Sequence, residues 1–225
     1  MYTQDFIKRM INQLVAALQM IIGLKAAGQY GQALQAINQA LEQLLGLKAD
    51  LVRRLADQTI LNSLTQDGRL DTDRLSILAD LFKEEGDIYA GLKDPAQSFA
   101  SYVRALNFYI EVALSPDAEE LPRPDDKLLD LFHDLQKYQL PAQTLYGMHE
   151  FFDRTGRYLQ AASILGQLAD DPDLREEAGQ ELKAFYQRLL DKTDAELEQG
   201  DLPRAEIMRR MPGLGLSPPA PFQTN

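Results

Sequence analysis

The stretch from Ala79 to Leu114 contains the feature that most restricts the fold of this chain. Apolar side chains recur at helical spacing on both sides of a break at Asp94 and Pro95. The carboxylate of Asp94 is placed to cap the second helix, and a proline is tolerated next because its missing N–H would have no intrahelical acceptor there. The pattern therefore predicts a helical hairpin. Its apolar positions are Leu81, Phe82, Ile88 and Tyr89 before the break, and Phe99, Tyr102, Val103, Leu106, Tyr109 and Ile110 after it.

Similar patterns before and after this hairpin predict an all-α protein of ten or so antiparallel helices. The first helix is expected to end at Gly28, where a left-handed residue can satisfy the last carbonyls. A turn is expected at Gly68, followed by a cap at Asp71. The remaining helices are expected in residues 28–47, 47–55, 58–64, 128–135, 141–152, 158–168 and 171–199, with a short one ending by 211.

Proline and acidic residues suggest where the chain divides. Residues 115–127 are acidic, proline-bearing and without apolar period, which is typical of an exposed linker. We therefore expect an N-terminal half over residues 1–114 and a C-terminal half over 128–211. Residues 212–225 combine prolines with glycines, and we expect a flexible tail or one laid across a neighbour.

The central hairpin resembles a tetratricopeptide unit, a repeat of about 34 residues with small side chains where two helices meet. With Ala79 as the first position, Gly86, Tyr89 and Ala105 fall on the family pattern and Ser98 takes the place of its usual small residue. Phe82 stands where the family has tryptophan, and the closing proline is missing. The small-residue positions Ala33, Ser98 and Ala161 lie 65 and 63 residues apart, close to two repeats each. The resemblance implies a divergent right-handed superhelix of stacked hairpins.

The same resemblance implies a groove lined by particular positions of each first helix. In the central unit these positions hold Asp80, Lys83 and Asp87. Family members that bind a terminal carboxylate have lysine and asparagine at the last two of these positions, so Asp87 departs from that pattern and would repel such a ligand. The corresponding positions of a later unit hold Gln143, Tyr146 and Glu150, which favours a basic or neutral partner segment.

The opening, YTQDFIKRMINQL, together with LLGL and EEGDIY, is also similar to an uncharacterised bacterial family of helical proteins. That similarity implies a fold and no activity.

The first helix has a wider apolar arc than one neighbouring helix requires. Val15, Leu18 and Ile22 fall where the repeat would otherwise present a solvated groove, so we expect something to cover them. The cover is the C-terminal tail, another helix of this chain, or the same helix of a second copy, and we favour a homodimer.

Composition excludes several kinds of chemistry. The chain has no cysteine, which rules out disulfides and thiolate ligands and fits a cytoplasmic location. A net charge of −11 repels phosphate backbones and anionic lipids, so neither nucleic acid nor membrane is an expected partner. His133 and His149 lie on different expected helices, and adjacent acids such as Glu84 and Glu85 are interpreted as solvated helix faces. No metal site and no cofactor are therefore expected.

These observations favour a non-catalytic protein-binding or scaffold module with a helical groove. Two alternatives remain open at this level: a small-ligand-binding protein or enzyme with a site between helices, and a protein that only self-associates.

Overall fold

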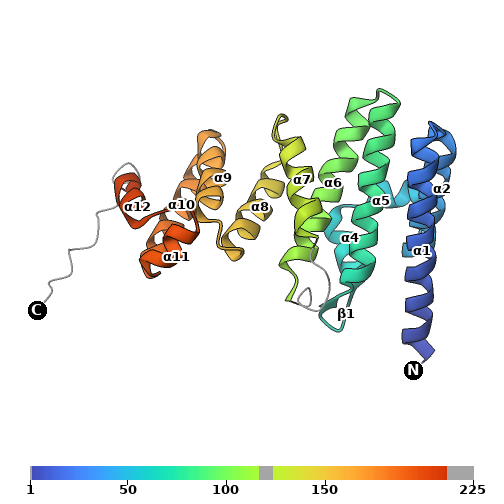
Figure 1. Cartoon of the computed structure of the whole chain (residues 1–225), viewed down its shortest axis with the longest axis horizontal. Helices are drawn as coiled ribbons and strands as arrows, with labels where there is room; N and C mark the ends of the chain where they lie inside the picture. The colour runs from blue at the N-terminus through green and yellow to red at the C-terminus, as the bar shows by residue number, and fades with distance from the viewer. Residues whose placement is uncertain (1, 117–123, 212–225) are drawn as a thin grey trace, which may run out of the picture. The chain divides into compact units, whose positions relative to one another are not determined.

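The computed structural model describes residues 2–116 and 124–211, in which helices joined by turns and loops accompany one short β-ladder (Figure 1). The all-α prediction is therefore confirmed. The helices are α1 (Tyr2–Ala26), α2 (Tyr30–Leu45), α3 (Ala49–Arg54), α4 (Asp57–Leu64), α5 (Thr72–Gly91), α6 (Pro95–Leu114), α7 (Asp125–Leu135), α8 (Ala142–Arg154), α9 (Tyr158–Asp170), α10 (Arg175–Leu189), α11 (Asp194–Gln199) and α12 (Arg204–Arg210).

The two aspartate caps lie where the sequence predicts them. The side chain of Asp94 accepts a hydrogen bond of 3.1 Å from the backbone N–H of Gln97, and Pro95 occupies the first position of α6. The side chain of Asp71 accepts one of 3.0 Å from the N–H of Arg74 at the start of α5. These caps satisfy backbone donors that the helices leave free, and thereby fix the starts of both helices of the central hairpin.

The expected turn at Gly68 is part of a small β-hairpin. Strands β1 (Thr65–Gln66) and β2 (Arg69–Leu70) pair antiparallel around Asp67 and Gly68. These two residues have φ angles of 52° and 77°, as a two-residue hairpin loop of the primed type requires. Glycine adopts such an angle without strain, which explains its place here.

The prediction of a single long helix over residues 171–199 is wrong. The chain leaves the helix after Leu189, and α11 begins at Asp194. Thr193 and Glu196 form a capping box there, in which the N–H of Thr193 donates to Glu196 Oε2 at 2.9 Å. A capping box satisfies two free donors at a helix start and therefore favours a new helix over a continuous one.

Contacts divide the chain into two compact units, Met1–Leu140 and Pro141–Asn225. Helix α7 belongs to the first unit, so this division lies after α7 and not at the linker expected over residues 115–127. Asp125 and Asp126, assigned to the linker, already form the first turn of α7. Residues 117–123 of the expected linker and the expected tail, 212–225, lie outside the described residues.

The first unit is built around the hairpin of α5 and α6, against which α1, α2 and α7 pack. Leu81, Ile88, Leu106 and Phe108 are completely buried in its core. The two helices of the hairpin approach closely at Gly86, where a Cβ atom would collide with the ring of Tyr102. A glycine is therefore required at this position for steric reasons.

The second unit packs α8 against α9 and α9 against α10. His149 is buried in this core, its Nδ1 lies 3.0 Å from the carbonyl oxygen of Ala161, and its ring meets Phe185 edge-on. The imidazole thus links two helices, as expected for a histidine with a structural role.

Candidate functional site

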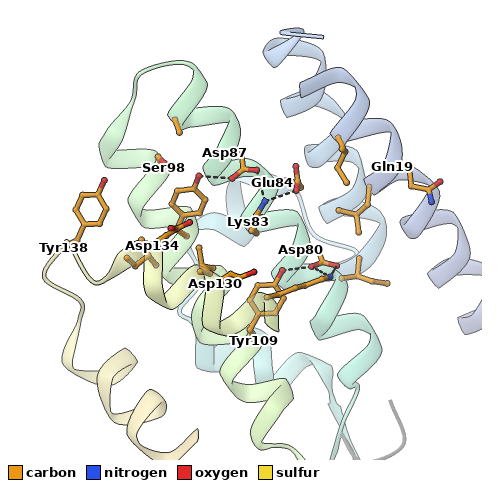
Figure 2. A pocket seen from close by; sticks show the side chains of 18 of the residues that line it. Gln19, Asp80, Lys83, Glu84, Asp87, Ser98, Tyr109, Asp130, Asp134 and Tyr138 are labelled. Atoms are coloured by element: carbon orange, nitrogen blue, oxygen red, sulfur yellow. Dashed lines mark hydrogen bonds and ion pairs between the residues drawn. The ribbon is translucent and has the colours of Figure 1, made fainter. Parts of the chain in front are cut away.

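The first unit contains a pocket of about 820 Å³ (Figure 2). We call it the groove. Helix α1 forms one wall, α5 lies in the middle with side chains from α6, and α7 with the residues after it forms the opposite wall. Its three parts differ in charge and in exposure.

The α1 wall is apolar and partly open. Val15 is 43% exposed and Ile22 is 47% exposed, whereas Leu18 is only 8% exposed. Leu14 and Ile21, on the adjacent face, are fully buried within this chain. The wide apolar arc of α1 therefore has an intrachain part and a part that faces the groove. Leu18 lies between the two parts, so it is only partly available to a partner.

The middle of the groove holds a compact network of charges around Asp87 of α5. Asp87 accepts hydrogen bonds from Lys25 of α1, from Lys83 at 2.9 Å and from the hydroxyl of Tyr102 at 2.8 Å. Lys25 also pairs with Glu84 at 2.5 Å. The network joins α1, α5 and α6 through side chains that are half-buried or buried.

This network sets the protonation of its members. Burial alone would raise the pKa of Asp87, but hydrogen bonds from Lys25, Lys83 and Tyr102 outweigh it and hold that pKa below its ordinary value. Burial would lower the pKa of Lys25, yet hydrogen bonds to Asp87 and Glu84 raise it. Both groups are thus held in their charged forms. At neutral pH Asp87 is a poor proton acceptor and Lys25 a poor nucleophile.

The sequence interpretation of Glu84 and Glu85 as solvated is wrong. Glu84 is 7% exposed and Glu85 is 1% exposed. Arg53 of α3 donates to Glu85 Oε1, its Nε lying at 2.8 Å, and the hydroxyl of Ser101 in α6 donates to Oε2 at 3.0 Å. Two adjacent helical residues, which point about 100° apart, thus have different surroundings, with Glu84 towards the groove and Glu85 towards α3 and α6.

Asp80 connects the middle of the groove to the opposite wall. It accepts a hydrogen bond of 2.5 Å from the hydroxyl of Tyr109 and pairs with Lys127 of α7 at 2.7 Å. Burial raises the pKa of Tyr109, and the nearby charge of Asp80 raises it further. Tyr109 therefore remains a neutral hydrogen-bond donor.

The α7 wall is acidic and exposed. Asp130 and Asp134 lie one helical turn apart on α7, and both line the groove (Figure 2). In contrast to the acids of α5, neither has an ion pair within residues 2–116 and 124–211. Tyr138 lies beyond them, 47% exposed, with Lys137 over its ring at 5.4 Å from the centroid.

The structure brings two separately predicted sets of residues into one site. Asp80, Lys83 and Asp87, predicted as groove positions, line the same pocket as Val15, Leu18 and Ile22, predicted as a self-association face. From the sequence, the groove positions and the self-association face were interpreted as two separate features, because no local pattern places α1 opposite α7. The charges of Asp130 and Asp134 were missed because α7 was assigned to the other half of the chain.

Gln143, Tyr146 and Glu150 belong to the second unit, where they follow one another along α8 at helical spacing. Gln143 is exposed, and Glu150 pairs with Arg154 at 2.5 Å. Burial raises the pKa of Tyr146, and the charges of Glu177 and Glu181 add to the effect. These residues do not line the groove of the first unit.

In residues 2–116 and 124–211, no three histidine, aspartate or glutamate side chains are grouped as a metal ion would require. None of the helices in this part of the chain is both long and apolar enough to cross a membrane.

Fold and site together define an all-α protein of helical hairpins with a charged groove in its first unit. A model of one protein family, DUF6483, described as a family of unknown function, matches residues 1–214, and the chain belongs to that family. This agrees with the similarity of its opening to an uncharacterised family. No curated protein and no solved structure matched the chain.

Proposed function

We propose that this protein is a non-catalytic interaction module that binds a segment of another protein in the groove. The observation that supports this most is the α1 wall, where Val15 and Ile22 leave apolar surface open along one side of a pocket of about 820 Å³. Covering exposed apolar side chains of this size is favourable by about 1 kcal/mol or more each, which a partner segment would gain on binding.

The packing of the first unit supports a tetratricopeptide-like arrangement as part of this proposal. Helix α5 contacts both helices of the preceding hairpin, α1 and α2, and forms a hairpin with α6. The aromatic ring of Tyr30 packs on Gly91 as that of Tyr102 packs on Gly86. Helical repeats of this kind leave an extended surface on the side of their first helices, which is where α1, α5 and α7 line the groove.

A small-ligand carrier is the second function that one observation favours. The pocket volume of about 820 Å³ lies within the range of about 300–1,000 Å³ that ligand sites occupy. The charged groups of α5, however, are already paired with one another or with Lys25 and Lys127, which leaves few polar groups directed at a small molecule. Self-association through Val15 and Ile22 is the third alternative, and sedimentation distinguishes it.

The experiment uses a photoreactive amino acid in the full chain, expressed in its source cell. Gln19 is exposed and lines the groove, whereas Gln160 is exposed on α9 of the second unit and serves as the matched control. We expect cross-linking from position 19 to one defined protein and none from position 160. The same pattern should disappear when Ile22→Ser is added. A cross-link to this chain itself would favour self-association, and cross-linking from both positions alike would contradict a groove-specific module.

A further inference from the structure

Three lysines in and beside the groove are already paired with carboxylates. Lys127 pairs with Asp80, and Lys83 and Lys25 pair with Glu84 and Asp87. These three lysines lie on α1, α5 and α7, and because acids of α5 already balance their charges they offer little to an anionic partner. An acidic segment would have to displace these pairs before it gained any of its own.

Within the described ranges, the groove charges that have no ion pair lie on the α7 wall, where Asp130 and Asp134 outnumber Lys137, whose amino group lies over the ring of Tyr138. Asp130 and Asp134 are exposed, are spaced by one helical turn, and have no ion pair within the described ranges. The phenol of Tyr102 lies close enough for the charge of Asp134 to raise its pKa, after the larger effects of burial and of Asp87. The acidic wall thus faces into the pocket, on the side where Tyr138 presents an aromatic ring.

The opposite wall supplies a different kind of contact. Val15 and Ile22 of α1 are about half exposed and apolar, and Gln19 lies between them. A partner segment in the groove therefore meets carboxylates and an aromatic ring on one side and aliphatic side chains on the other. Such a pair of walls is complementary to a segment that carries basic residues on one side and apolar residues on the other.

Building on the proposed function, we infer that the occupant of the groove is a basic amphipathic segment of a partner protein. Its lysine or arginine side chains pair with Asp130 and Asp134. One of these cations also takes the place of the amino group of Lys137 above the ring of Tyr138; in the structure that amino group lies 5.4 Å from the centre of the ring. Its apolar side chains cover Val15 and Ile22. The charge of −11 over the whole chain attracts the same class of segment at long range.

The test is a selection of random 12-residue displayed peptides on the purified full chain, followed by affinity measurement of the selected peptides as synthetic probes. The charge variant is Asp130→Asn with Asp134→Asn. Its matched control is Asp170→Asn with Asp173→Asn, which removes two exposed acids from the second unit. The apolar variant is Ile22→Ser, and its control is Leu51→Ser, because Leu51 is 46% exposed and does not line the groove.

We expect selected peptides rich in lysine or arginine that also carry apolar residues. Their affinity should fall roughly tenfold in the charge variant, as two lost pairs would produce, and should weaken as salt is added. Ile22→Ser should weaken binding as well, and both control variants should bind as the wild type does.

Three results would overturn the inference, and they can be told apart. The first result is a set of peptides that carry no basic residues, bind less well to Ile22→Ser and bind the charge variant as they bind the wild type. Such peptides would exclude a basic occupant, although the groove would remain the binding site. If the affinity of every selected peptide is the same for the wild type and for both groove variants, the proposed function itself is contradicted. A wild-type dimer that Ile22→Ser dissociates would make a second copy of this chain the occupant.

Discussion

The hydroxyl of Tyr102 donates a hydrogen bond of 2.8 Å to Oδ1 of Asp87, which joins α6 to the charged middle of the groove. The same carboxylate accepts from Lys25, 62 residues earlier in the chain. Asp87 therefore holds three helices together, and it does so on the surface that we propose for binding. Substitution of Asp87 is therefore expected to affect both the stability of the first unit and the proposed binding.

Replacement of Asp87 by asparagine should destabilise the first unit. The amide has no charge to balance Lys25 and Lys83, and half-buried donors lose their acceptor, so we expect a cost of about 1–3 kcal/mol in the free energy of unfolding. Denaturant unfolding followed by circular dichroism measures it. Asp170→Asn, at an exposed acid of the second unit, is the matched control and should change stability by less than about 0.5 kcal/mol.

The contribution of Asp87 should depend on pH in acid. Its pKa in the folded protein lies below the ordinary 3.8, so its stabilising effect is complete above pH 3.8 and is lost as the pH falls through the lower folded value. The difference in unfolding free energy between the wild type and Asp87→Asn should therefore shrink below about pH 4. A difference that stays constant down to pH 2 would mean that this carboxylate is not held charged by its partners.

Lys25 should act at the other end of the pH range. Its pKa is raised above the ordinary 10.5, so its stabilising effect is complete below pH 10.5 and is lost as the pH rises through the folded value. Thermal unfolding of the wild type and of Lys25→Met between pH 8 and 12 should show the two melting temperatures approaching each other at the alkaline end. Melting temperatures that stay equally far apart would contradict the pairing.

Gly86→Ala should be strongly destabilising. The added methyl group would collide with the ring of Tyr102 at the closest approach of α5 and α6. We expect a loss of about 1–3 kcal/mol, as overpacking produces. The matched control is Gly179→Ala in α10, where a Cβ would meet nothing within 4 Å; it should raise stability by up to about 1 kcal/mol through helix propensity. Equal effects at the two glycines would exclude the steric explanation.

Two residues of α1 should respond differently to charge. Leu18 is 8% exposed, so Leu18→Glu should lower the melting temperature markedly, whereas Ile22, at 47%, should tolerate Ile22→Glu with little loss of stability. Sedimentation of the wild type and of Ile22→Glu then tests the dimer prediction. If both sediment as monomers at high concentration, self-association through this face is contradicted.

The fold of the central hairpin could be predicted from sequence because its signals are local. Apolar residues at helical spacing and the capping pair of Asp94 and Pro95 specify two helices and the break between them, and the structure has both. The prediction that one long helix continues to Gln199 was wrong, and the reason is also local. The capping box of Thr193 and Glu196 went unrecognised inside a strongly charged stretch.

The groove could be predicted only in part because its network is made of distant contacts. Repeat positions placed Asp80, Lys83 and Asp87 on one face of a helix, and all three line the pocket. Their partners Lys25 and Tyr109 come from other helices, and no local pattern indicates such pairs. For this reason, adjacent acids such as Glu84 were interpreted from the sequence as solvated, whereas in the structure Glu84 pairs with Lys25.

The most direct test of groove binding is a two-dimensional NMR titration of the labelled full chain with a basic amphipathic peptide selected on it. We predict that the largest chemical-shift changes follow the two walls and the middle of the groove, at Gln19, Asp130 and Lys83, and that Gln143 and Glu150 change little. Largest changes along Gln143, Tyr146 and Glu150, or changes spread evenly over both units, would contradict it.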